Sequence, residues 1–148
     1  MSDAELNKAA LLIAKLLLRT REGKIQWKFE NDPLARALAS SRFYKADLGE
    51  GLEAHLSSDD KALQFKLWGP PATELPQEFF AGIFSGRDNN DVISILLDHS
   101  HGKTGLISPE SVVYRDLAEL IFLAENPKSV SDDLRYQQAL THLDKLSA

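Results

Sequence analysis

The sequence contains no cysteine, and no run of apolar residues in it is long enough to cross a membrane. Without cysteine, disulfides and thiolate metal sites are excluded. The most apolar run, Ala9–Leu18, has ten residues including Lys15, whereas a membrane-spanning helix needs about 20. Asp3 and Glu5 precede this run and Arg19 follows it, an order unlike that of a signal peptide. Together these features favour a cytoplasmic protein.

Positive charge is also scarce, with 17 Lys and Arg against 22 Asp and Glu and a net charge of −5. We therefore expect no general attraction to nucleic acid or to an anionic membrane. A small basic cluster of Arg19, Arg21, Lys24 and Lys28 follows the apolar run, where cations complement the end of a helix. With 148 residues, 43% of them hydrophobic, the chain is expected to form a single domain over residues 1–148.

The composition around the apolar run predicts a helix from Ala4 to Arg19, with Ser2 or Asp3 as its N-cap. At about 100° per residue, its apolar side chains cover more than half of the helix circumference. Because a surface helix has an apolar arc of only roughly 100° or somewhat more, this helix needs cover on at least two sides. A sheet would supply one cover. Another helix, or a second copy of the protein in a homodimer, would supply the other.

Alternation of apolar and polar residues predicts an antiparallel meander after this helix, with one face packed and one face wet. The predicted strands are a short one over Ile25–Phe29 and three longer ones over Phe43–Leu48, Leu52–Ser57 and Leu63–Trp68. The apolar, β-branched run Val92–Asp98 predicts a strand covered on both faces, and Leu106-Ile107 a last short strand. Residues 76–84 fit either a short helix or a buried strand.

Two helices are predicted at the end of the sequence. Ser108-Pro109-Glu110 is typical of a helix start, and Asn126-Pro127 ends that helix after Glu125. The last helix is predicted from about Ser131 to Leu146, with Ser129 or Ser131 as its cap. The expected fold class is α+β: an N-terminal helix, an antiparallel sheet of four to six strands, and two C-terminal helices packed on one face.

The segment Asp98-His99-Ser100-His101 is the candidate for metal or acid–base chemistry. Two His residues separated by one residue on an extended segment point to the same side, and Asp98 could add a carboxylate ligand. No further ligand stands at a matching spacing, and a polar turn after a strand gives the same pattern. A metal-dependent hydrolase centred on His99 and His101 is therefore one hypothesis.

Trp68 is the candidate binding residue, because alternation places it on the wet face of its strand together with Lys66. His55 of the neighbouring strand is expected on the same face. An exposed Trp is often an anchor in a protein–protein interface. The alternative is that the Pro-rich segment after Trp68 folds over and buries it.

The run Thr20–Trp27 contains the pattern Thr-x-x-Gly-Lys-x-x-Trp, and it is followed by the meander segments Tyr44–Leu48 and Leu52–Leu56 and by the helical segment Leu117–Leu120. In these features the chain resembles a group of short bacterial proteins with a helix, a β-meander and a C-terminal helix. This resemblance implies the fold but no activity. The size, acidity and apolar first helix are also similar to those of small secretion chaperones, which are homodimers.

These observations favour a non-enzymatic, cytoplasmic protein that binds another protein, such as an inhibitor, an immunity-type protein or an adaptor. No cofactor, nucleic acid or membrane is expected as a partner. A chaperone for a secreted effector is the second hypothesis, and the metal-dependent hydrolase is the third.

Overall fold

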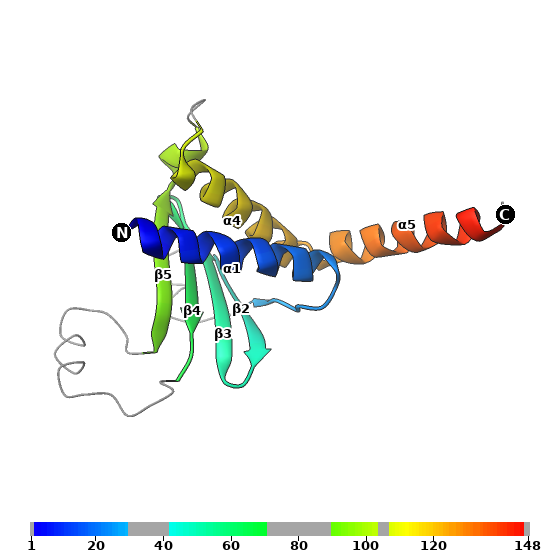
Figure 1. Ribbon diagram of the computed structural model, residues 1–148, viewed down its shortest axis with the longest axis horizontal. Helices are drawn as coiled ribbons and strands as arrows, with labels where there is room; N and C mark the ends of the chain where they lie inside the picture. The colour runs from blue at the N-terminus through cyan, green and yellow to red at the C-terminus, as the bar shows by residue number, and fades with distance from the viewer. Residues whose placement is uncertain (1, 30–41, 71–89, 104–106, 147–148) are drawn as a thin grey trace.

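In the computed structural model, which describes residues 2–29, 42–70, 90–103 and 107–146, one antiparallel sheet carries two helices on one face (Figure 1). These helices are α1 (Asp3–Arg21) and α4 (Pro109–Glu125), and a last helix, α5 (Pro127–Leu146), extends away from the sheet. The predicted α+β class, with one N-terminal and two C-terminal helices, is confirmed.

The first helix begins as its sequence predicts. The Ser2 hydroxyl accepts a hydrogen bond from the Glu5 backbone N–H at 3.1 Å, which satisfies one of the free donors at the helix start. Arg19 and Arg21 lie in the last turn, where positive charges interact favourably with the negative end of the helix dipole. One stripe of α1 is buried, formed by Leu6, Ala9, Ile13, Leu16, Leu17 and Thr20.

The apolar face of α1 is covered from two sides within the same chain. Its buried residues join one core with the inner face of the sheet and with α4, which lies beside α1 (Figure 1). Leu11 and Leu18 remain exposed on the outer side of α1. Since α4 supplies the second cover, the reason for expecting a homodimer through the first helix no longer holds.

The sheet has five strands in the order β1-β2-β3-β4-β5, each antiparallel to its neighbour. The turn between β2 and β3 is Gly49-Glu50-Gly51, and all three residues have positive φ (86°, 58° and 81°), a conformation that glycine adopts without strain. The strands are β1 (Lys28–Phe29), β2 (Arg42–Gly49), β3 (Leu52–Ser58), β4 (Ala62–Trp68) and β5 (Asp91–Asp98).

One face of this sheet carries the core. Alternate residues of β2 to β5 point toward α1 and α4, with Phe65 of β4 fully buried at the centre. The helix α4 begins after its cap Ser108 and buries the apolar set that its periodicity predicts: Val113, Leu117, Leu120, Ile121 and Ala124. The opposite face of the sheet carries no helix in the part of the chain that the structure describes, and we call it the helix-free face.

The last helix differs from its prediction in two ways. It begins at Pro127, directly after Asn126, and not at Ser131, because proline is well suited to the first position of a helix. It also does not pack on the sheet, and none of its residues is fully buried. Only its first two turns contain half-buried side chains, those of Val130, Ser131 and Leu134.

Two predicted short strands are not found at their predicted length. The strand expected over Ile25–Phe29 is limited to Lys28–Phe29, while Ile25 and Trp27 pack against the edge of the core. Ile107 is an exposed non-strand residue, and its predicted partner Leu106 lies outside the described residues. Residues 76–84 also lie outside them.

Candidate functional site

The helix-free face of the sheet brings together the three residues that the sequence proposes for binding. Cross-strand pairing places Lys45 opposite His55 and His55 opposite Lys66, so the three side chains form a row across β2, β3 and β4. Trp68 lies two residues after Lys66 and therefore on the same face, opposite Glu53. The antiparallel register, rather than any sequence motif, assembles this group.

Three rings stack along this face. His55 lies 6.3 Å from Trp68 between ring centroids, with the planes nearly parallel at 20°. On its other side Phe43 meets His55 edge-on, at 5.4 Å and 60°. Ring pairs with these geometries stabilise each other by about 0.5–1.5 kcal/mol beyond the burial of their surface. We call Phe43, His55 and Trp68 the ring row, and its contacts hold the Trp68 side chain in one orientation.

Two carboxylates balance the positive charge beside the ring row. Glu53 accepts a hydrogen bond from Nε2 of His55 at 2.9 Å and lies 3.6 Å from the Lys45 ammonium. Asp91, whose side chain is only 7% exposed, lies 3.6 Å from the ammonium of Lys66. These carboxylates offset the charges of the two lysines on this face. The ring row therefore lies beside two lysines whose charges are offset by carboxylates.

Apolar side chains extend the helix-free face along β5. Val92 and Leu96 are 54% and 62% exposed, whereas Ile93, Ile95 and Leu97 are buried against the helices. The prediction that this strand is covered on both faces is therefore wrong. Continuous apolar sequence indicated burial on both sides, but β5 is the last strand in the sheet order, and none of the described helices covers its helix-free side.

Sequence reasoning placed Trp68, Lys66 and His55 correctly on one face, but it missed Phe43, Glu53, Val92 and Leu96 as parts of the same surface. Phe43 and His55 touch only because β2 and β3 pair in one particular register. The short Gly-rich turn sets this register, so counting back from Gly49-Glu50-Gly51 would have been the signal that finds Phe43.

The Asp98–His101 segment does not form the extended pair that its spacing suggests. Residues His99–Gly102 form a short 3-10 helix (η1), capped by Asp98, whose carboxylate accepts hydrogen bonds from the backbone and the hydroxyl of Ser100. These bonds, with that from the hydroxyl first, lower the pKa of Asp98. The Asp98 carboxylate therefore stabilises the start of η1.

His99 is held at both ring nitrogens. Its Nε2 donates to the backbone carbonyl oxygen of Asp59 at 2.8 Å, and its Nδ1 lies 2.8 Å from the hydroxyl of Tyr114, which donates to it when the ring is neutral. Burial raises the pKa of that hydroxyl. A metal ion at His99 would have to displace one of these bonds. Among the described residues, no three His, Asp or Glu side chains are grouped so that they could hold a metal ion.

Replacing Asp59 with Ala is expected to lower the melting temperature by a few degrees at pH 7, as judged from the usual worth of two backbone hydrogen bonds. The Asp59 carboxylate accepts from the N–H groups of Lys61 and Ala62, at 2.7 and 2.8 Å, and these bonds lower the pKa of Asp59. A lowered folded-state pKa stabilises the fold above the unfolded pKa, and the stabilisation is lost as pH falls through the folded value.

The difference in melting temperature between wild type and Asp59→Ala should therefore shrink as the solution is acidified below about pH 4. Asp60→Ala is the matched control, because the next carboxylate in the same turn has no such bond in the described part of the chain. Equal effects of the two substitutions, or a difference that persists at low pH, would contradict this account.

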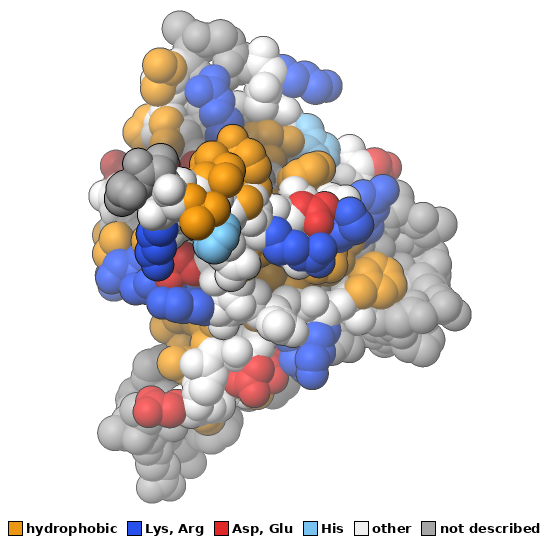
Figure 2. Space-filling model, turned by 90° about the vertical axis from the view of Figure 1, so that its right-hand side faces the viewer, with side chains coloured by type: hydrophobic (Ala, Val, Ile, Leu, Met, Phe, Trp, Pro, Cys, Tyr) orange, Lys and Arg blue, Asp and Glu red, His pale blue; other side chains and the backbone are white. Residues whose placement is uncertain are grey.

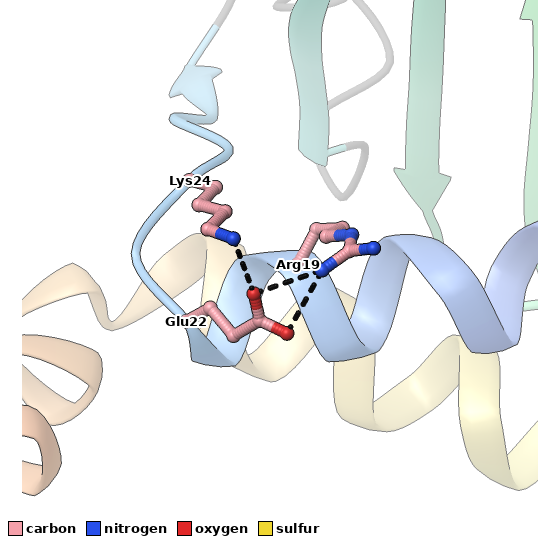
Figure 3. Close-up of polar contacts among 3 residues, drawn as sticks. All are labelled: Arg19, Glu22 and Lys24. Carbon is pink, nitrogen blue, oxygen red and sulfur yellow. Dashed lines mark hydrogen bonds and ion pairs between the residues drawn. The ribbon is translucent and has the colours of Figure 1, made fainter.

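The basic cluster at the end of α1 is largely paired. Glu22 lies 3.0 Å from both the Arg19 guanidinium and the Lys24 ammonium (Figure 3). The hydrogen bonds from Lys24 and then Arg19 lower the pKa of Glu22. Arg21 pairs with Glu119 of α4. The arginines lie where cations interact favourably with the C-terminal end of the helix dipole. Their carboxylate partners neutralise much of the positive charge in this region.

A cavity of about 430 Å³ lies where the segment after α1 meets the start of α5. Its walls are mainly apolar, and the Trp27 indole at one wall donates a hydrogen bond to the buried Thr20 hydroxyl at 3.0 Å. Gly23 has a positive φ of 74°, and a Cβ there would lie 2.9 Å from Leu134. The lining includes Ile25, Trp27, Leu123, Val130 and Leu134.

Comparison with protein-family models, with curated proteins and with solved structures gave no match to this sequence. Across the described segments, no helix has the length and apolar character needed to cross a membrane. The functional argument therefore depends on the geometry of the molecule itself.

Proposed function

We propose that this chain is a non-enzymatic, cytoplasmic protein-binding module that contacts its partner through the helix-free face. The observation that carries the proposal is the ring row, in which Phe43 meets His55 edge-on and His55 stacks on the half-buried Trp68, beside two paired lysines. Binding hot spots are enriched in Trp and are surrounded by contacts that exclude water. The exposed Val92 and Leu96 add apolar area beside this row.

The chemistry of the face defines the partner that it suits. Because Glu53 and Asp91 already offset Lys45 and Lys66, strong attraction by net charge is not the basis of recognition. The complementary surface is another protein with an apolar or aromatic centre and a polar rim, as in ordinary protein–protein interfaces. An inhibitor, an immunity-type protein or an adaptor would work by this kind of contact.

The non-enzymatic part of the proposal is supported by the two described histidines that have the most contacts. His55 stacks on Trp68, meets Phe43 edge-on and is hydrogen-bonded to Glu53, and its side chain is only 16% exposed. His99 has both ring nitrogens in hydrogen bonds. His99 therefore has no ring nitrogen free to act as a general base.

The proposal predicts that Trp68→Ala and Leu96→Asp each weaken partner binding by at least tenfold. A partner captured from the native cell extract would be purified and titrated by calorimetry against wild type and both variants. Leu96 is 62% exposed, so Leu96→Asp should leave the fold intact even if Trp68→Ala alters the end of β4. Leu11→Asp, on the outer side of α1, is the matched control and should bind like wild type.

Two outcomes would refute the proposal. One is a partner whose affinity responds to Leu11→Asp but to neither substitution on the helix-free face. The other is turnover of a defined substrate that one polar substitution abolishes. A chaperone for a secreted effector stays the second hypothesis, favoured by the exposed Leu11, Leu18, Val92 and Leu96, and it predicts binding of an unfolded segment instead of a folded partner.

A further inference from the structure

The second half of α5 presents an exposed apolar stripe. At about 100° per residue, its members fall within one arc of the helix surface. Figure 2, which views the molecule from the side on which α5 projects, shows hydrophobic side chains gathered at its centre. We call this set the α5 stripe: Tyr136, Leu140, Leu143 and Leu146, which are 60%, 41%, 58% and 68% exposed, with Ala139 between them.

The α5 stripe points away from the rest of the molecule. Val130 and Leu134 are half-buried and line the cavity at the base of the helix. These two residues therefore mark the side of α5 that faces the fold. At about 100° per residue, the centre of the α5 stripe lies nearly opposite that side. A second helix can approach it without meeting the sheet or α1.

This part of the helix also lacks the packing that normally stabilises helices. Every residue from Arg135 to Leu146 is exposed, and α5 extends beyond the other elements (Figure 1). Isolated helices shorter than about 12–15 residues are marginal in water, because most helical stability comes from packing of an amphipathic face. The second half of α5 therefore requires a partner on its apolar side.

The charges beside the α5 stripe show which partner fits. One flank carries Asp133 and Asp144, and the other carries Arg135. In an antiparallel pair of identical helices, each flank faces the same flank of the other copy, so the acidic flank would face itself. In a parallel pair, each flank faces the opposite one, so Asp133 lies near Arg135 of the other helix. Opposite charges across a helix pair are favourable and like charges are not.

We propose that α5 pairs in parallel with α5 of a second copy of this chain, joined through the α5 stripe. Because the stripe is opposite to the side that faces the fold, the two folded bodies lie on the outside of the pair. No residue of the helix-free face takes part, so this inference is independent of the proposed function. It would place two helix-free faces on one assembly and make binding to a multivalent partner stronger.

The dimer should be weak. From their exposed fractions, the side chains of the α5 stripe offer about 400 Å² per copy, roughly half of the ~800 Å² per partner in a standard stable interface. We therefore expect dissociation constants in the micromolar range and a mass that changes with concentration. Strong, permanent association is not expected.

The first test measures mass by analytical ultracentrifugation from about 1 μM to 1 mM. Wild type should change from monomer to dimer within this range, and Leu143→Asp should weaken association at least tenfold. Leu143 is 58% exposed, so this substitution leaves the core intact. Gln138→Asp, on the other side of the same helix, should associate like wild type.

Three results would overturn the inference. One is a monomer at 1 mM, which would leave the α5 stripe for a different protein. The second is a dimer that Leu143→Asp does not weaken. The third is equal weakening by Gln138→Asp.

The second test determines orientation, and the absence of cysteine makes it simple. Single-cysteine variants Ala139→Cys and Leu146→Cys should each form a disulfide between copies under mild oxidation, because equivalent residues face each other in a parallel pair. Gln138→Cys should not form one. Cross-linking at position 139 but not 146 would indicate an antiparallel pair, and cross-linking at 138 would place the contact elsewhere. Either result would overturn the proposal.

Discussion

Ile13→Lys is expected to unfold the protein, or to lower its stability by more than about 4 kcal/mol out of a total of roughly 5–15. Ile13 is 0% exposed and lies where α1 meets the sheet and α4. Lysine would lose this packing and would place an unpaired ammonium in an apolar core. Burial of an unpaired charge is among the most destabilising changes that one substitution can make. Urea unfolding followed by circular dichroism would measure the loss.

Leu11→Lys is the matched control for this result. It changes the same kind of residue to the same charge two positions away, but Leu11 is 60% exposed. Its effect should stay within about 0.5 kcal/mol, the usual range for surface substitutions. If Ile13→Lys fails to fold, Ile13→Val still tests the site, since loss of one buried methyl typically costs about 1 kcal/mol. Equal effects of the two lysine substitutions would mean that the assigned buried face of α1 is wrong.

Phe65→Ala is expected to cost about 3–5 kcal/mol, the usual range for removing a buried phenylalanine from a close-packed core. Phe65 is 0% exposed at the centre of β4, and it contacts the core that α1 and α4 share with the sheet. Its loss would open a cavity beneath both helices at once. Thermal and urea unfolding would show the change as a lower midpoint.

Phe122→Ala gives the comparison for the same chemical change on the surface. Phe122 is on α4 but is 54% exposed, so truncation there should cost no more than about 0.5 kcal/mol. A large loss of stability from Phe122→Ala with a small loss from Phe65→Ala would mean that the buried and exposed sides are assigned wrongly. Comparable losses would mean that Phe122 is covered in solution by another molecule.

The sequence predicted the shared face of Trp68, Lys66 and His55 because residues two apart in a strand point to the same side. It could not predict that His55 stacks on Trp68, since that contact depends on the register between β3 and β4. The same is true of the carboxylate partners Glu53 and Asp91. A pattern along one strand carries no information about the side chains of the next.

For the Asp98–His101 segment, the sequence suggested a contact that the structure does not contain. Its spacing suggested a pair of ligands, but spacing places two side chains together only when the backbone conformation is known. Here the backbone turns into a 3-10 helix, in which residues two apart diverge. The two ring nitrogens of His99 are then hydrogen-bonded to the Tyr114 hydroxyl of α4 and to the Asp59 carbonyl of the β3–β4 turn. Both partners come from distant parts of the sequence.

The sequence alone determined the order and type of α1, the five strands, α4 and α5, and the packed face of the meander. These follow from local periodicity, capping residues and turn residues, which act over a few neighbouring positions. Only the tertiary structure decided that α4 completes the cover of α1, that β5 is exposed on one side, and that α5 projects with its apolar stripe free. The physical reason is that burial depends on which elements meet in space, and the amphipathic pattern of a helix does not specify whether its partner is in the same chain.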